Sequence, residues 1–456
     1  MKKIYIDGTE IEFGEKSSWV KRFLLSIKDW VIFNYKTLSP AWQITLFITV
    51  LVSILNILFR RDFSSIGWAA PFASVLILVL PYLQDVIIGI YNGKTRVVKD
   101  FPTLIKVKNL KISSDDEAMG FKYIPDPGGD EGVVMSTEVN RRIFLDQEFD
   151  MPLEDTGPLR EKEIIDSLAS RRYIFSTYIT QKFLKSLSSK NPLINESKIG
   201  FCNSFWNENE VCQVYKTTYF YSLCSGDLAM SMACRDQGDI RPTLVENRVL
   251  TSLIPSDDNF EMRSFEDRRK PISLHGGVEL IGVSKDYFLR VAVQGDHTQF
   301  SQGKKAPLGS GSMDWEDFLK SKSLKNLIKI SAVREFLEEW GKKHSIKENI
   351  TIENILCIGF FRMPHRGGKP QFVVLCKFGN NNQQLRADAS EVYLEEPENN
   401  DCLFRVSNLK ELGGAVRKIL ENSDKRNSVP LLGAMSCLKD AIEFAPDMIS
   451  NTLGYK

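Results

Sequence analysis

The chain has 456 residues, and its 59 Lys and Arg nearly balance its 58 Asp and Glu, giving a net charge of +1. This length predicts roughly three domain-sized units of about 150 residues each. The balanced charge argues against a globally basic nucleic-acid binder, and we expect no DNA partner. Eight cysteines without a CxxC spacing and four histidines argue against a zinc site and indicate reduced thiols in a reducing compartment.

Two apolar runs follow a mostly polar N-terminal segment, residues 1–40. The first run extends from Ala41 to Phe59 without a charge, and the second extends from Ile66 to Asp85, its only charged residue. Each run is about as long as a helix that crosses a hydrocarbon core of roughly 30 Å. We therefore predict two transmembrane helices within residues 41–92.

Lysines and arginines predict the orientation of these helices. The loop between the two runs holds only Arg60 and Arg61. The outer flanks are more basic, with Lys21, Arg22, Lys28 and Lys36 on one side and Lys94, Arg96, Lys99, Lys106 and Lys108 on the other. By the positive-inside rule, both termini face the cytoplasm of a multi-pass protein in the lipid bilayer. The alternative is a buried hairpin in a soluble protein.

Residues 93–265 are interpreted as a juxtamembrane linker and an α+β extension. Turn formers and acids over 113–132 predict a loop. A helix is expected over 159–187 and a strand over 211–221. The highly charged stretch 256–271 is interpreted as a linker, which sets a domain boundary near residue 266.

The pattern changes after this boundary, in residues 266–456. Two short strands are expected around a turn at Ser284–Asp286, followed by a Gly-rich loop at 307–317. The next segment, 323–343, carries apolar residues mainly at three- and four-residue spacings and predicts an amphipathic helix. Further strands are expected over 355–361 and 370–378.

The polar face of this helix carries a cluster of glutamates. Helical spacing places Glu335, Glu338 and Glu339 on one face, where like charges destabilise an isolated helix. A divalent cation would relieve that repulsion, and carboxylate oxygens suit Mg²⁺ or Mn²⁺. Arg334 lies four residues before Glu338 and offers an alternative partner. The remaining alternative is a solvated acidic face.

The segment from Arg334 to Gly341 resembles the second half of the Nudix box, G-x5-E-x7-R-E-U-x-E-E-x-G-U, where U is a bulky apolar residue. The resemblance implies an α/β Nudix domain, an α/β/α sandwich with a mixed sheet, over residues 266–456. It implies metal ligands at Glu335, Glu338 and Glu339, with Glu338 and Glu339 as the catalytic pair of an active enzyme.

The first half of the box departs from this pattern. Counting back from Arg334 puts Lys320 at the glycine position and Asn326 at the glutamate position. In the alternative alignment, Gly311 and Asp317 keep the opening spacing, and residues 318–333 form an insertion. A substrate misplaced by about 1 Å loses its near-attack geometry. This interruption of the box therefore favours metal binding over catalysis.

Two Gly-containing segments are candidate phosphate-binding sites, because backbone N–H groups and basic side chains suit phosphates. An ordinary hairpin turn is the alternative for the second segment. The candidate ligands in the two segments are Gly309, Gly311, Arg362, His365, Arg366 and Lys369.

The order of two transmembrane helices and a Nudix-like domain is similar to that of two-transmembrane Nudix effectors associated with CD-NTases in bacterial CBASS anti-phage systems. This resemblance implies a sensor for a cyclic oligonucleotide second messenger made by a CD-NTase. It also implies homo-oligomerisation on activation and disruption of the bacterial inner membrane, ending in cell death. The alternative is a membrane-tethered, Mg²⁺-dependent Nudix hydrolase of a nucleoside diphosphate derivative.

Overall fold

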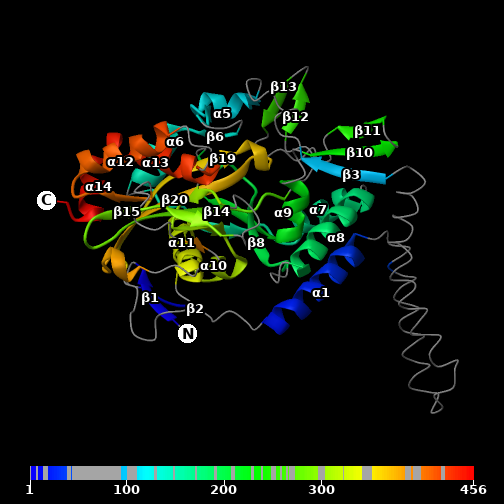
Figure 1. Ribbon diagram of the computed structural model, residues 1–456, viewed down its shortest axis with the longest axis horizontal. Coiled ribbons are helices and arrows are strands. Elements are labelled where there is room, and N and C mark those ends of the chain that lie inside the picture. The colour runs from blue at the N-terminus through cyan, green and yellow to red at the C-terminus, as the bar shows by residue number, and fades with distance from the viewer. Residues whose placement is uncertain are drawn as a thin grey trace, which may run out of the picture.

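The computed structural model shows a mixed α/β protein with an eight-stranded mixed sheet and flanking helices (Figure 1). The predicted transmembrane segments, Ala41–Phe59 and Ile66–Asp85, lie outside the described residues except for Gln43. Within the described part, no helix combines the length and the apolar character needed to cross a membrane. The structure describes residues 2–6, 9–13, 19–37, 43, 94–99, 110–127, 131–146, 149–169, 172–188, 193–206, 211–226, 231–237, 240–247, 253–256, 259–262, 265, 273–295, 303–321, 323–340, 352–385, 392–393, 402–422 and 427–455.

The eight-stranded sheet has the order β22-β15-β14-β20-β19-β6-β5, and β18 also pairs with β14. Its central pair, β14 and β20, is parallel, and the other pairs are antiparallel. The strands are β5 (Lys122–Pro125), β6 (Gly132–Met135), β14 (Gly277–Val283), β15 (Phe288–Arg290), β18 (Gly309–Ser312), β19 (Ile352–Met363), β20 (Lys369–Phe378) and β22 (Leu403–Arg405).

Helices cover both faces of this sheet. One face packs against α11 (Leu324–Trp340), preceded by the short α10 (Trp315–Leu319), and the other packs against α12 (Leu409–Glu421), α13 (Val429–Phe444) and α14 (Pro446–Leu453). Alternation along β14 sends Val278 to the core under α11 and Ile281 to the core under α13. Because both faces are covered, β20 is buried along its whole length.

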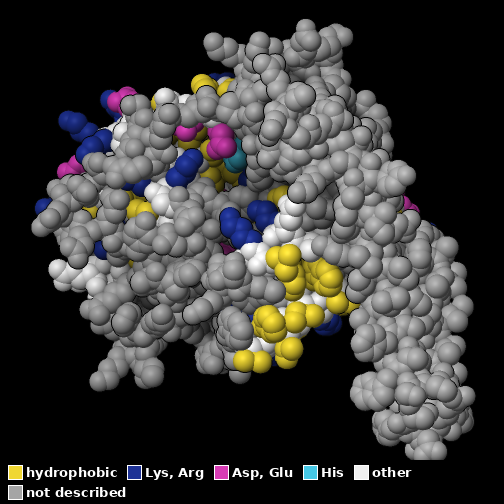
Figure 2. Space-filling view, turned by 45° about the vertical axis from the view of Figure 1, so that its right-hand side comes forward, with side chains coloured by type: hydrophobic (Ala, Val, Ile, Leu, Met, Phe, Trp, Pro, Cys, Tyr) yellow, Lys and Arg dark blue, Asp and Glu magenta, His cyan; other side chains and the backbone are white. Residues whose placement is uncertain are grey.

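A smaller three-stranded sheet lies beside the large one. Its order is β7-β9-β8, from β7 (Leu153–Asp155), β9 (Cys212–Thr218) and β8 (Ser197–Phe201). Four helices are associated with it: α1 (Trp19–Lys36), α7 (Leu159–Ala169), α8 (Arg172–Ser188) and α9 (Tyr219–Ser225). Phe33 of α1 enters their shared core, while other apolar side chains of α1 lie on the molecular surface (Figure 2).

The remaining elements are short. Additional pairings join β1 with β2, β13 with β12 and β4, β10 with β3 and β11, and β16 with β17 and β21. These elements and the remaining helices are β1 (Lys2–Ile6), β2 (Thr9–Phe13), β3 (Lys94–Lys99), β4 (Leu110–Ile112), β10 (Ser231–Gln237), β11 (Ile240–Asn247), β12 (Leu253–Ser256), β13 (Asn259–Met262), β16 (Ala292–Gln294), β17 (Lys305–Ala306), β21 (Val392–Tyr393), α5 (Ser114–Ala118), α6 (Thr137–Asn140), the π-helix η2 (Arg141–Leu145) and the 3₁₀ turns η4 (Pro364–Arg366) and η5 (Asn382–Gln384).

The prediction of a loop over 113–132 was wrong. The stretch 113–132 contains α5 and β5, because Ser113 acts as a helix cap, accepting a bond from the Asp116 amide, rather than as a turn residue. β5 and β6 extend the large sheet, so this sheet reaches across the expected boundary at residue 266. The charged stretch 256–271 contains β13, which pairs with β12 and anchors the buried Met262.

Two element boundaries also differ from the predictions. The helix expected over 159–187 is two helices, α7 and α8: α7 packs against β9, α8 packs against α1, and both contact α9. The strand expected over 211–221 ends at Thr218, where the Thr218 hydroxyl accepts a hydrogen bond from the Tyr221 amide and caps α9.

Candidate functional site

The guanidinium of Arg334, on α11, lies at the centre of a carboxylate cluster. Its Nε is 3.0 Å from Asp317 Oδ2. Its Nη1 is 3.0 Å from Glu335 Oε1 and 3.2 Å from Glu338 Oε1, and lies 3.3 Å from Asp314 Oδ2. Burial alone would lower the pKa of Arg334, but the four carboxylates raise it well above its usual value. Arg334 therefore stays cationic and neutralises the glutamate face of α11.

The glycines of β18 allow α11 to reach this position. A Cβ on Gly311 would lie 2.1–2.4 Å from the carboxylate of Glu335, and a Cβ on Gly309 would lie 3.1 Å from the backbone of Phe336. The close approach lets the Ser312 amide donate to Glu335 Oε1 at 2.9 Å. The Gly-rich stretch expected as a loop is therefore a strand, and Gly309 and Gly311 serve helix packing.

Asp317 links α10 to α11. Its side chain is fully buried and accepts hydrogen bonds from Arg334 and from the Ser331 hydroxyl, the latter at 2.8 Å. Its second role is at the start of α10, where it accepts a bond from the Asp314 amide. A buried carboxylate needs such partners, because desolvation without them is costly. Asp317 is thus held by one partner at the start of α10 and by two partners on α11.

Lys198, on β8 of the smaller sheet, completes the cluster. It forms ion pairs with Asp314 and, at 2.8 Å, with Glu196. Burial would lower the pKa of Lys198, but Asp314 and Glu196 raise it above its usual value. Lys198 and Arg334 share Asp314, which precedes α10. The cluster therefore links β8 of the smaller sheet to α10 and α11, which lie on the large sheet.

These side chains do not fit a divalent ion in this arrangement. Arg334 Nη1 contacts both Glu335 and Glu338 and lies where a shared cation would bind. Across the described ranges, no group of three or more His, Cys, Asp or Glu side chains is arranged to hold a metal ion. Glu339, the third predicted ligand, is buried with only 8% exposed. We therefore assign no chemical step to Mg²⁺ or Mn²⁺.

A second group of buried polar side chains lies on β14, β20 and their flanks. Glu279 is 1% exposed, and burial raises its pKa to about 8 against the lowering effects of Ser310, Lys369 and Arg366. Its Oε2 has no hydrogen-bond partner among the described residues, and neither does Oε1 of the buried Gln371. Register places Gln371 opposite Gly277, two residues from Glu279.

His275 precedes β14 in the same region. Both of its ring nitrogens are buried without a hydrogen-bond partner in the described part of the chain. Burial, followed by the charges of Lys369, Arg366 and Lys198, lowers its pKa well below the usual value, so the ring is neutral. Lys369 and Arg366 act electrostatically on both His275 and Glu279, and Lys198 connects this group to the Arg334 cluster.

Orphaned buried polar atoms in a native fold call for a missing partner such as a water or a ligand. Here they include a neutral carboxyl that can donate, an amide oxygen that can accept and an imidazole that can do both. The neighbouring cations Lys369 and Arg366 suit an anionic group. In chemical terms, these groups would suit a ligand that carries both hydrogen-bonding groups and phosphate.

Arg362 differs from the other basic residues of its segment. It is 1% exposed and lies 3.5 Å from Asp116 Oδ2, with its Nε donating to the Gly368 carbonyl at 3.0 Å. Its guanidinium carbon lies 4.5 Å from the centre of the Phe265 ring. Burial lowers its pKa to about 10, partly offset by Asp116. These contacts give Arg362 a structural role.

His365 and Arg366, in η4, are half-buried, and Lys369 at the start of β20 is buried. Arg366 and Lys369 act electrostatically on the same two buried groups, His275 and Glu279, and the phosphate-binding role of both residues stays a prediction. Sequence reasoning missed Lys198, Asp314, Glu279 and Gln371. Only Asp314 had a signal, because it lies in the acid-containing end of the stretch 307–317.

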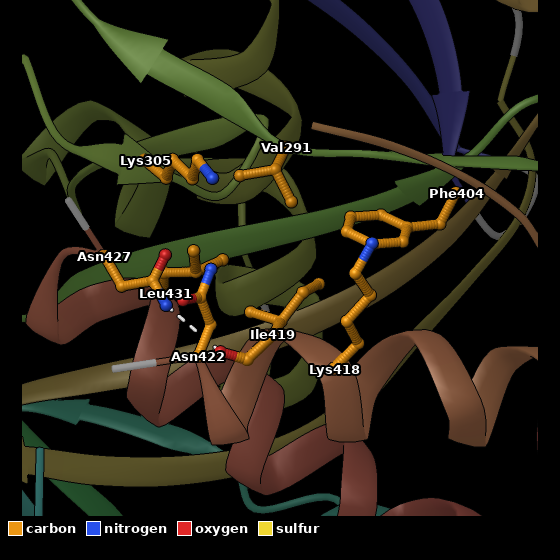
Figure 3. Close-up of a pocket in the computed structure, with 8 residues that line it drawn as sticks. All are labelled: Val291, Lys305, Phe404, Lys418, Ile419, Asn422, Asn427 and Leu431. Atoms are coloured by element: carbon orange, nitrogen blue, oxygen red, sulfur yellow. Dashed lines mark hydrogen bonds between the residues drawn. The ribbon is translucent and has the colours of Figure 1, made fainter. Parts of the chain in front are cut away.

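A small cavity lies apart from this site, between β17, β22, the end of α12 and the start of α13 (Figure 3). It has room for about one water molecule, roughly 10 Å³, which excludes a nucleotide. Lys418 lies over the Phe404 ring at 5.6 Å, and Asn427 donates to the Ile419 carbonyl at 3.1 Å. We assign no function to this cavity.

Comparison with models of known protein families gives no match, and comparison with curated proteins also gives none.

Proposed function

We propose that this chain is a membrane-anchored effector of a CBASS-type antiviral system. In this proposal, a cytosolic Nudix-like domain binds a cyclic oligonucleotide made by a CD-NTase. Binding drives homo-oligomerisation, and the transmembrane segments over 41–59 and 66–85 then disrupt the bacterial inner membrane. The proposal combines the two apolar runs with the chemistry of the site on β14, β20 and α11.

The arrangement of α11 supports a Nudix-like domain. The helix carries Arg334 to Trp340 of the motif and packs under the Gly-containing strand β18 on a mixed sheet. Of the two alignments of the first half of the box, the one with Asp317 at the glutamate position brings that acid into contact with Arg334. Asn326, the residue in the other alignment, lies in the first turn of α11. This contact favours the insertion at 318–333.

The ion pairing of Arg334 is the observation that favours binding over hydrolysis. The carboxylates that a catalytic metal would need are already neutralised by a cation of the protein itself. Beside them, Glu279, Gln371 and His275 retain buried hydrogen-bonding atoms without described partners. A fold with cations and unsatisfied polar groups in place of a metal centre is suited to recognising a phosphate-containing ligand without cleaving it.

Ligand binding by the full-length, detergent-solubilised chain tests the proposal. A panel of cyclic di- and trinucleotides is titrated in EDTA and in Mg²⁺, and the same samples are analysed for cleavage products. We expect metal-independent binding and no cleavage. Substituting the buried Lys369→Met is expected to weaken binding about tenfold or more, because a charged hydrogen bond is lost. The exposed Lys410→Met on α12 is the matched control.

Two outcomes would contradict this proposal. One is the absence of binding to every cyclic nucleotide together with an unchanged oligomeric state. The other is Mg²⁺-dependent turnover that disappears in Glu338→Gln and Glu339→Gln, which would identify the tethered hydrolase instead. In cells, toxicity is expected to survive these two substitutions and to disappear when residues 41–91 are deleted.

A further inference from the structure

Helix α1 is apolar on two separate faces. Its inner face packs against α8: Trp30 stacks on Phe183 with ring centroids 5.6 Å apart, and its indole N–H donates to Thr180 Oγ1 at 3.0 Å. Phe33 is buried on the same side, one turn further along. These contacts account for one apolar face and fix the rotation of the helix about its axis.

The outer face carries a second apolar stripe. Val20 is 59% exposed, Leu24 is 60% exposed and Ile27 is 37% exposed. Their spacings of four and three residues place them on one line along the helix, and the half-buried Val31 continues that line by four more. Apolar side chains gather on the face where α1 lies (Figure 2). A surface stripe of this kind marks an interaction with an apolar partner.

Basic residues border the outer stripe. Lys21 and Lys28 are exposed and lie seven residues apart, so helical geometry places them on one line beside Leu24. Long basic side chains beside an apolar stripe can lie along it and place their ammonium groups at the level of lipid phosphates. An apolar stripe with a lysine edge is characteristic of helices that lie in a membrane interface.

The position of α1 in the chain identifies the partner. The helix ends at Lys36, and the first predicted transmembrane run starts at Ala41. The five Cα–Cα steps from Lys36 to Ala41 span at most about 18 Å, so the end of α1 stays close to the start of that run. With 18 residues, α1 is about 27 Å long. A bilayer that holds residues 41–59 therefore lies within reach of the stripe.

From these observations we infer that α1 is an interfacial helix that lies in the headgroup region of an anionic lipid bilayer. The stripe of Val20, Leu24 and Ile27 enters the acyl boundary, and Lys21 and Lys28 contact lipid phosphates. The inner face stays on α8, so the helix fastens the folded domain to the membrane surface. This inference rests on the proposed membrane anchoring and adds a lipid-binding surface to it.

Fluorescence quenching by lipid tests the position of the stripe. The full-length Leu24→Cys chain is labelled with a polarity-sensitive fluorophore and reconstituted into vesicles that contain anionic phospholipid, with or without nitroxide-labelled lipid. Leu24 is exposed, so the substitution should leave the fold intact. We expect blue-shifted emission and loss of most of the intensity with nitroxide lipid. The unsubstituted chain, labelled in parallel, reports the background from its own cysteines.

Phe444→Cys is the matched control. Phe444 is another exposed apolar residue, 51% exposed, at the end of α13 on the opposite side of the large sheet from α11. Its label should keep its emission in nitroxide lipid. An unquenched label at Leu24 would overturn the inference. The emission could instead be blue-shifted, unquenched by nitroxide lipid and stronger at higher protein density. That result would assign the stripe to a second copy of the chain and would also overturn the inference.

Alkaline carbonate extraction separates this inference from the proposed anchoring. A chain that stays with the vesicles after extraction but shows no quenching at Leu24 retains its anchor and lacks an interfacial α1. A chain that is extracted by carbonate but is quenched at Leu24 before extraction binds through α1, and the anchoring proposal then fails.

Discussion

Glu279 is expected to make the fold less stable as the pH rises through neutrality. Its pKa is about 8 in the folded chain, compared with 4.5 for an ordinary glutamate. The folded state therefore holds this proton more tightly than the unfolded state does. Between these two pKa values the unfolded state binds fewer protons, so the free energy of unfolding falls as the pH rises, and it levels off above pH 8.

The size of this effect follows from the shift in pKa. At about 1.4 kcal/mol per pKa unit, the stability lost between pH 4.5 and pH 8 is roughly 4–5 kcal/mol. In Glu279→Gln the group no longer titrates, so this loss disappears. A domain of this size changes its Tm by about 2–4 °C per kcal/mol, which predicts that the variant gains about 10 °C on the parent between pH 5 and pH 8.

Thermal unfolding of the full-length chain in detergent, measured at pH 5, 6, 7 and 8, checks this prediction. The matched control is Glu353→Gln, which changes an exposed glutamate on β19 of the same sheet. We expect the Glu353→Gln curve of Tm against pH to run parallel to the parent curve. A parallel curve for Glu279→Gln as well would mean that Glu279 is ionised in the folded chain, and the argument from burial would be refuted.

Two further predictions concern the packing and charge of α11. Gly311→Ala places a Cβ within 2.4 Å of the Glu335 carboxylate and should destabilise the fold by about 1–3 kcal/mol. The control, Gly413→Ala, adds a Cβ in open space on α12 and should stabilise the fold by up to about 1 kcal/mol. Equal shifts in Tm for the two variants would contradict this prediction. Arg334→Met leaves the buried Asp317 without its cation and should cost about 3–5 kcal/mol. Arg141 forms an exposed ion pair, so Arg141→Met should lower the Tm far less than Arg334→Met does, and equal shifts for both arginines would show that Arg334 is screened by solvent.

Periodicity predicted the elements that bury one regular face. The helix expected over 323–343 is observed as α11, because residues such as Leu327 and Phe336 recur at helical spacing and all enter one core. The strand expected over 370–378 is observed as β20, because an apolar run of that length fills the centre of a covered sheet. Local pattern and tertiary packing agree in these segments.

Composition was a poorer guide where packing sets the residue type. Glycines at 309 and 311 predicted a loop, but they occur in a strand because α11 approaches too closely for a side chain. The charge cluster was foreseen only on α11 itself, including the pairing of Arg334 with Glu338. Lys198 lies more than a hundred residues earlier, and nothing in its local sequence distinguishes it from a surface lysine. Contacts between distant segments carry no local signal.

The ion-pair cluster and helix α1 meet on one short segment, residues 193–198. At its start, the Leu193 carbonyl accepts a hydrogen bond from the Ser26 hydroxyl at 2.6 Å, and the Asn195 amide donates to Asp29 at 2.9 Å. At its end, Lys198 forms the ion pairs that lead to Arg334. A ligand beside Lys198 and a membrane at α1 would therefore act on the same few residues. Such contiguity transmits a signal only when the ligand binds one arrangement of the segment more tightly than another.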